Sequence, residues 1–265
     1  MTKHPGGRVA SESGCDGSAD DANDLIGAGA SDLVVLRALG KRQRMAKTIR
    51  QTTDGRSVVE PHDGRRVFQV SHARTLKIDD IVQAGRALAR VAADEFVVRG
   101  AIRASANTRR MRRLLHPKDN TPATMAEVPR AYVLFDVDGA EPLIDFDPRN
   151  QLIEEQGPPD DPASFAPWEA AIDEFIREAL PPAFHGTSCW WQFTAGMGFK
   201  PGLHMRLLFI LDRPMLGDDL KRWLGPQLRQ RGLASAVFGP VQQILVAPPM
   251  LKDGITDRSA GAPDG

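Results

Sequence analysis

Two aspartates, separated by one residue, follow a short apolar segment in the middle of the chain. Residues 132–135 (YVLF) predict a buried strand, and Asp136, Val137, Asp138 and Gly139 come directly after it. Alternate side chains of a strand share a face, so both carboxylates are expected to point the same way, roughly 7 Å apart. Such a pair suits Mg²⁺ or Mn²⁺ held against substrate phosphates. It also suits a plain solvated strand end, because Asp-Gly is a common turn pair.

A second group of polar residues lies on a predicted hairpin. Residues 190–194 and 204–211 predict two strands, and the loop between them is rich in glycine. Lys200 lies in the loop, and His204 and Arg206 share one face of the return strand. Glycines let backbone N–H groups approach a phosphate, so the three side chains are candidate ligands of a triphosphate. Alone, a histidine at a strand start is more often structural; the upstream aspartate pair favours the binding role.

Arginines supply a third signal. Between Phe96 and Lys118 the chain contains no acidic residue, and another basic stretch precedes this interval. On a neutral protein such clusters predict local phosphate-binding surfaces, although either cluster alone is adequately explained as a solvated face. The predicted nucleic-acid contacts are Arg99, Arg109, Arg110, Arg112 and Arg113, and the other cluster is Lys41, Arg42, Arg44, Lys47 and Arg50.

The elements that must position these residues follow from hydrophobic periodicity. Strands mixed with helices predict an α/β or α+β domain. Residues 145–167, rich in Pro, Asp and Glu, predict a surface connection between two halves of the core. The predicted strands are residues 33–39, 66–70, 96–102, 131–137, 190–194, 204–211 and 243–246. The predicted helices are residues 78–91, residues 168–180, and one from residue 218 that stops near residues 225–226.

Composition excludes several classes of protein. The chain has 265 residues, with 34 Lys and Arg against 34 Asp and Glu, so its neutral charge excludes a histone-like binder. Two cysteines exclude a disulfide framework and a cysteine zinc cluster, and favour the reducing cytoplasm. No apolar run approaches the ~20 residues of a membrane helix, and the N-terminus does not look like a secretory signal. Residues 1–31 and 253–265 predict disordered tails around one domain, residues 32–252.

In their order and spacing, these segments resemble the archaeo-eukaryotic primase superfamily, specifically the primase-polymerase domains of phage and mobile-element replication proteins. YVLFDVDG looks like the acid-x-acid motif of that family, which implies metal ligands at Asp136 and Asp138. FTAGMGFKPGLHMRLLFILDRP looks like the loop and Ser-x-His motif, which implies a nucleotide-phosphate ligand at His204. VVRGAI and VFGPVQQILVAPPM are also similar, so the resemblance extends over residues 32–251.

The resemblance implies an α+β, two-lobed primase-polymerase-like fold with an αβ lobe and an RRM-like lobe. It implies a DNA primase/polymerase-like nucleotidyltransferase serving replication of a mobile element such as a prophage. Template-directed transfer would use Mg²⁺ or Mn²⁺ at Asp136 and Asp138, with His204 as a catalytic residue and Lys200 and Arg206 as further nucleotide contacts. The partners would be a DNA template and nucleoside triphosphates. No Walker A sequence is present, so a separate helicase is expected.

Two positions depart from the family pattern. Gly202 stands where the serine of Ser-x-His is expected, and residues 233–236 (LASA) stand where a third acid is expected. Asp212 is too far along the strand to replace that acid, about 26 Å from His204 at about 3.3 Å per residue. The remaining candidates are Asp145, Asp147 and Asp253.

Two alternatives follow. One is a catalytically impaired primase-like module that binds DNA during replication. The other is a phosphatase of the haloacid dehalogenase type, whose strand also ends in DxDG with the first aspartate as nucleophile. That motif usually lies near the N-terminus and continues with Thr or Val, whereas Ala140 follows it here.

Overall fold

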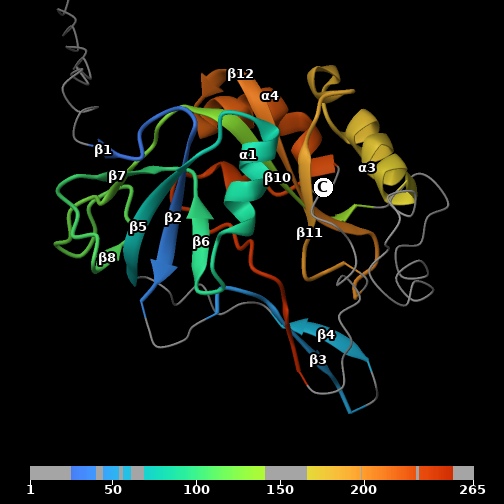
Figure 1. The fold of residues 1–265 in the computed structure, drawn as a ribbon, viewed down its shortest axis with the longest axis horizontal. Coiled ribbons are helices and arrows are strands. Elements are labelled where there is room, and N and C mark those ends of the chain that lie inside the picture. Colours follow the sequence, from blue (N-terminus) through green and yellow to red (C-terminus); the bar gives the residue numbers. More distant parts are fainter. Residues whose placement is uncertain are drawn as a thin grey trace, which may run out of the picture.

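The structure, a computed structural model, describes residues 25–39, 44–53, 56–60, 69–140, 166–197, 199–230 and 233–252. Strands and helices combine in a mixed α+β architecture, as predicted (Figure 1). The strands in these ranges form one sheet of four strands and three sheets of three strands.

The four-stranded sheet has the order β6-β2-β5-β8 and is antiparallel throughout. Strand β2, one of the two inner strands, is buried on both faces. Leu33 and Val35 join the core that contains helix α1, whereas Val34 and Leu36 join a second apolar cluster. A strand buried on both sides needs a continuous apolar run, which explains its sequence DLVVLRA. The strands are β2 (Asp32–Ala38), β5 (Gln69–Lys77), β6 (Glu95–Val98) and β8 (Met111–Arg112).

Helix α1 (Ile81–Ala89) begins where the sequence provides an N-cap. The carboxylate of Asp80 accepts a hydrogen bond of 2.7 Å from the backbone N–H of Gln83, which satisfies one free donor of the first turn. The helix is shorter than the predicted range 78–91. Ile78 is buried but lies before the helix, so its apolar side chain matches the helical spacing without belonging to the helix.

A three-stranded antiparallel sheet, in the order β10-β12-β11, carries the motifs of interest. On one face Phe135 contacts Phe184, Phe209 and Phe238 edge to face, with centroids 5.4–6.0 Å apart. Helices α3 and α4 supply further residues to the same core. The elements are β10 (Arg130–Ala140), β11 (Trp190–Phe193), β12 (Leu203–Met215), α3 (Ala166–Ala179), η4 (Pro182–Phe184), α4 (Gly217–Gln230) and η5 (Ser235–Phe238).

Two small sheets complete the described architecture, in the orders β1-β7-β9 and β13-β3-β4. In the second, β13 runs parallel to β3, which brings the last described strand beside an early one. The strands are β1 (Leu25–Ile26), β7 (Ala101–Arg103), β9 (Met125–Ala126), β3 (Thr48–Gln51), β4 (Ser57–Glu60) and β13 (Met250–Leu251).

Residues 25–31 belong to the folded domain, so the predicted N-terminal boundary at residue 31 lies too late. β1 pairs with β7, and the fully buried Arg130 donates hydrogen bonds to the carbonyl oxygens of Gly27 and Gly29. The backbone carbonyls of this glycine-rich stretch, rather than apolar side chains, hold it in place. Residues 1–24 and the predicted tail 253–265 lie outside the described residues.

Several predicted elements differ in extent. The predicted strand 96–102 is interrupted at Gly100, whose N–H donates to Pro240 O and where a Cβ would lie 2.7 Å from that oxygen. Residues 243–246 form only an isolated bridge between Ile244 and Val97. Helix α4 continues past Gly225 because Leu228 is buried in the core. Of the predicted strand 66–70, residues 69 and 70 belong to β5, and residues 66–68 lie outside the described part of the chain.

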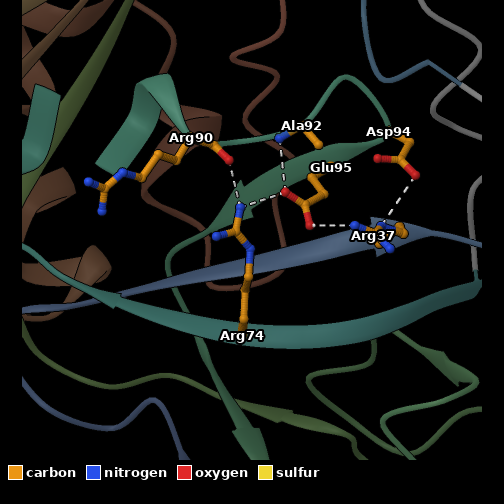
Figure 2. Close-up of polar contacts among 6 residues, drawn as sticks. All are labelled: Arg37, Arg74, Arg90, Ala92, Asp94 and Glu95. Carbon is orange, nitrogen blue, oxygen red and sulfur yellow. Dashed lines mark hydrogen bonds and ion pairs between the residues drawn. The ribbon is translucent and has the colours of Figure 1, made fainter. Parts of the chain in front are cut away.

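A buried carboxylate anchors the four-stranded sheet (Figure 2). Glu95 is 3% exposed, and its two oxygens accept hydrogen bonds from Arg37 at 3.2 Å and from Arg74 at 2.7 Å. The backbone N–H of Ala92 donates to the same carboxylate, and Arg74 also donates to Arg90 O. Burial by itself raises the pKa of Glu95, but the hydrogen bonds from Arg74 and Ala92 and the charges of Arg74 and Arg37 bring it below 4.5.

Replacing Glu95 by Gln is expected to lower the free energy of unfolding by about 1–3 kcal/mol near neutral pH, because two arginines lose a charged acceptor. The folded pKa lies below the ordinary value of 4.5, so this stabilisation is present above about pH 4.5 and is lost as the pH falls through the folded pKa. Urea denaturation between pH 7 and pH 3 measures the difference from the parent chain, which should shrink on the acid side. Glu60→Gln is the control, since Glu60 pairs with Arg50 and Lys252 in a more exposed place and should change stability by less than about 1 kcal/mol. A Glu95→Gln difference that does not change with pH would contradict the role of the charge.

Candidate functional site

The predicted polar residues meet across the β10–β12 pair. In the register of the two strands, Asp136 lies opposite Arg206 and Asp138 lies opposite His204. Opposed residues point to the same face, so all four side chains lie on one face of the sheet. Asp138 Oδ1 lies 2.8 Å from His204 Nδ1, and Asp136 Oδ1 lies 3.4 Å from Arg206 Nε. The strand that bears Asp136 and Asp138 therefore lies directly beside the strand that bears His204 and Arg206; the chemical roles of these residues stay predictions.

Close packing by glycines fixes the His204 imidazole. A Cβ on Gly196 would lie 2.6 Å from the ring, and one on Gly139 would lie 3.8 Å from Cε1. On the other side, Nε2 lies 3.0 Å from the carbonyl oxygen of Pro201. The buried Nδ1 is close to Asp138 but outside hydrogen-bonding orientation, so the ring is held by packing while one nitrogen has no hydrogen bond within the described structure.

Gly202 explains the missing serine of the Ser-x-His pattern. It has φ +81°, and a Cβ there would lie 2.7 Å from Ala140 O and 2.9 Å from the carbonyl carbon of Gly139. Any side chain at this position would push β10 and β12 apart. The turn therefore requires glycine where the resembling family has a hydroxyl.

Lys200 lies in the loop between β11 and β12, as predicted. Its backbone N–H donates to Gly196 O at 2.8 Å, which closes the turn over His204. Its ammonium makes no ion pair with a described residue. A contact of Lys200 with a nucleotide stays a prediction.

The segment in which a third acid was expected lies directly beside Asp136. Ala234 N–H donates to Asp136 O at 3.0 Å, and Leu233 forms a bridge with Val137. The segment thus lies beside the strand that bears the carboxylates, but its side chains there are Ala234 and the exposed Ser235.

Among the described residues, no three His, Cys, Asp or Glu side chains lie close enough together to hold a metal ion. Asp212 is exposed and lies on β12 beyond Ile210, which pairs with Tyr132, so it is remote from the site. Asp145, Asp147 and Asp253 fall outside the described residues.

The carboxylate pair still fits a hard divalent cation that arrives with its substrate. The side chains of Asp136 and Asp138 are 31% and 57% exposed and share a face. Mg²⁺ commonly takes one or two protein carboxylates and fills its other positions with substrate phosphates and water. Asp138 now contacts His204 and Asp136 contacts Arg206, so a metal would have to replace those contacts.

A small pocket beside Arg206 contains residues that the sequence did not connect to the site. In the β11–β12 register Gln192 lies opposite Arg206, and Thr194 N–H donates to His204 O. Lys47 reaches this pocket from the strand region of β3. In the sequence, Lys47 stood out only as one member of a basic cluster, and nothing singled out Gln192. The proximity of the two residues depends on strand pairing, which local sequence does not show. The remaining lining residues are Phe193, Ala195, Leu245, Ala247, Pro248 and Pro249.

Two of the predicted nucleic-acid contacts, Arg99 and Arg113, form hydrogen bonds inside the fold instead. Arg99 is 3% exposed and donates hydrogen bonds to the carbonyl oxygens of Tyr132 and Met215, so no guanidinium surface remains for a phosphate. Arg113 packs over the ring of Phe96 at 5.2 Å and donates to Val241 O, and burial lowers its pKa to about 10. Both arginines satisfy carbonyl oxygens inside the fold, and neither fits the predicted contact.

The other three predicted contacts lie nearer the surface. Arg109 and Arg110 are exposed, and Arg110 Nε donates to Gln69 Oε1 at 2.9 Å. Arg112 pairs with Asp119 at 3.1 Å. The acid just beyond the acid-free interval therefore neutralises part of the cluster, which leaves Arg109 and Arg110 as the better candidates for a phosphate contact.

Comparison of the chain with protein-family models, curated proteins and solved structures found no match. No helix in the described ranges is long and apolar enough to cross a membrane.

The contact between Gly196 and His204 gives a direct test of the site geometry. Gly196→Ala is expected to lower the free energy of unfolding by about 1–3 kcal/mol, because the added methyl group overlaps the imidazole. Gly225→Ala in helix α4, where a Cβ has open space, should instead raise stability by up to about 1 kcal/mol. Denaturant titration measures both variants. Adding His204→Ala to Gly196→Ala should recover part of the loss; strictly additive effects would contradict the contact.

Proposed function

We propose that this protein is a primase-polymerase-like nucleotidyltransferase that acts on a DNA template during replication of a mobile element. One observation carries the proposal: two partly exposed carboxylates on β10 face a buried histidine and a buried arginine on β12, on one face of an antiparallel sheet. Carboxylates suit metal ions, and the arginine guanidinium and a histidine N–H suit phosphate oxygens. Nucleotidyl transfer requires these two chemistries side by side.

In the proposed site Asp136 and Asp138 would hold Mg²⁺ or Mn²⁺, which would supply charge neutralisation at the transferred phosphate. His204 would contact the incoming triphosphate. The buried Arg206 and the loop residue Lys200 would add positive charge. In this arrangement metal–carboxylate and cation–phosphate contacts would replace the present Asp–His and Asp–Arg contacts.

We infer a two-lobed arrangement for this fold. The RRM-like lobe would consist of the β10-β12-β11 sheet with α3 and α4, and the αβ lobe would consist of the four-stranded sheet with α1. Trp190 of β11 packs against Gly85 of α1, so the apolar end of the site face lies under the αβ lobe. At the polar end of that face the side chains of Asp136 and Asp138 stay partly exposed.

A catalytically impaired DNA-binding module is the second candidate, and one observation favours it. Ala234 and Ser235 lie where a third carboxylate would complete the metal site, directly beside Asp136. For the phosphatase alternative, the described residues add no support, since Asp136 lies within strand β10, which continues to Ala140, and faces Arg206.

Asp136→Asn is expected to abolish nucleotide incorporation on a primed single-stranded template with Mn²⁺, because the neutral amide is a weak metal ligand. DNA affinity should stay equal or rise, since a negative charge is removed. Gel-based extension and fluorescence anisotropy measure the two properties. Asp212→Asn, an exposed change on β12 away from the site, is the control and should leave both unchanged. Unchanged incorporation by Asp136→Asn would overturn the assignment, and a parent chain that binds DNA without incorporation would favour the impaired module.

The exposed arginines test the proposed template surface. Replacing Arg109 and Arg110 together by Ala should weaken binding to all single-stranded sequences alike and reduce the slope of log affinity against log salt by about 1.4, at about 0.7 per phosphate contact. Lys221→Ala with Arg222→Ala on α4 removes the same charge elsewhere and should leave the slope unchanged. Equal slopes for all three chains would assign Arg109 and Arg110 to solvent.

A further inference from the structure

A cavity of about 390 Å³ lies between helix α1 and the start of strand β11, two elements that pack against each other (Figure 1). Pockets that bind small molecules have volumes of roughly 300–1,000 Å³, so this α1–β11 pocket is large enough for such a ligand. The helix contributes lining residues between Ile81 and Ala89, and Cys189 and Trp190 form the opposite wall.

The walls of the α1–β11 pocket are mainly apolar. Gly85 brings the two walls into contact, because a Cβ there would lie 2.9 Å from Trp190 Cδ1. One turn away, Val82 lines the pocket but is 56% exposed, and Ala89 is exposed as well. The helix therefore presents apolar surface to water inside a concave site, and an apolar molecule that covered this surface would gain binding free energy.

The polar groups in this pocket that lack a partner are hydrogen-bond donors. Trp190 is 4% exposed, and its indole Nε1 can only donate. This N–H makes no hydrogen bond with a described residue, and it is not among the atoms that the fold closes off from solvent. Arg86 lines the same pocket, is exposed, and makes no ion pair with a described residue. Since an unpaired donor costs free energy, a ligand with acceptor oxygens would gain affinity here.

No carboxylate lines the described walls to compete with an anionic ligand. Burial, together with the charge of Asp173, raises the pKa of the Cys189 thiol to about 11, so the thiol is neutral near pH 7. Asp173 itself is exposed on α3 and is not a lining residue. The only charge on the lining residues is thus the positive charge of Arg86.

We propose that the α1–β11 pocket binds a small apolar molecule that carries one anionic group, such as a hydrophobic carboxylate. The apolar body would cover Val82 and Ala89, and the anionic oxygens would accept hydrogen bonds from Trp190 Nε1 and Arg86. The two donors start from neighbouring positions, because Arg86 follows Gly85, and a Cβ on Gly85 would lie 3.3 Å from Nε1. This inference does not depend on the proposed function.

Two fluorescent dyes with the same aromatic body test the proposal. 8-Anilino-1-naphthalenesulfonate is anionic, and N-phenyl-1-naphthylamine is the same molecule without the sulfonate. Titration of the full chain with each dye gives the two affinities. Arg86→Gln should weaken binding of the anionic dye about fivefold and leave the neutral dye unchanged, because only the sulfonate uses the guanidinium. Arg213→Gln removes an exposed positive charge from β12 and is the control, which should change neither affinity.

Two further variants locate the dyes. Ala89→Phe places a ring in the pocket from an exposed helix position and should weaken both dyes by about tenfold or more. Val58→Phe adds the same ring at an exposed position of β4 and should weaken neither. Trp190→Phe keeps an aromatic ring but removes the donor, so the affinity for the anionic dye relative to the neutral dye should fall about threefold. Thermal denaturation establishes that each variant is folded.

The outcomes separate the pocket from its chemistry. If the parent chain binds neither dye, or if Ala89→Phe leaves both affinities unchanged, the pocket is not a binding site. If Arg86→Gln leaves the relative affinity for the anionic dye unchanged, the assignment of an anionic ligand is overturned. None of these results depends on nucleotide incorporation, so the proposed function is tested separately.

Discussion

The antiparallel register of β10 against β12 is the constraint on which the site depends. Successive side chains of a strand alternate between faces, so a slip of one residue would exchange Asp136 and Asp138 with Phe135 and Val137. Phe135 sits among three other aromatic rings, and a slip would bring carboxylates into that aromatic core without partners. Such burial costs several kcal/mol or more. The aromatic face thus holds the charged face in place.

The sequence was informative wherever one residue pattern decides a local structure. Apolar runs located β10 and β12, and alternation predicted that His204 and Arg206 share a face. It was uninformative where contacts join distant segments. The residues next to Gln192 in the sequence do not indicate that Lys47 and Pro248 line the same pocket. Likewise, the segment that contains β1 is held by hydrogen bonds from Arg130 to backbone carbonyl oxygens, which a hydropathy pattern cannot predict.

Arginine illustrates the same limit for a single residue type. Arg99 and Arg130 are buried, each donating to backbone carbonyl oxygens, whereas Arg109 is exposed. Burial of a guanidinium is tolerated only where its donors find acceptors, and those acceptors come from remote parts of the chain. A count of local charges cannot separate these cases, because it contains no information on which carbonyl groups the fold leaves free.

The parallel pairing of β13 with β3 has a consequence for the order of folding. Val246 orients Gln192, Ile244 bridges to Val97, and Met250 N–H donates to Lys47 O, so the wall of the pocket beside Arg206 comes from a segment that is synthesised after β10 and β12. Contacts between such distant segments form late, because closing long loops costs entropy before any contact offsets it. During translation the β10–β12 pair can assemble first, and the pocket wall forms only after residues 244–251 have emerged from the ribosome. Formation of the pocket wall then reports that residues 244–251 have docked onto the rest of the fold.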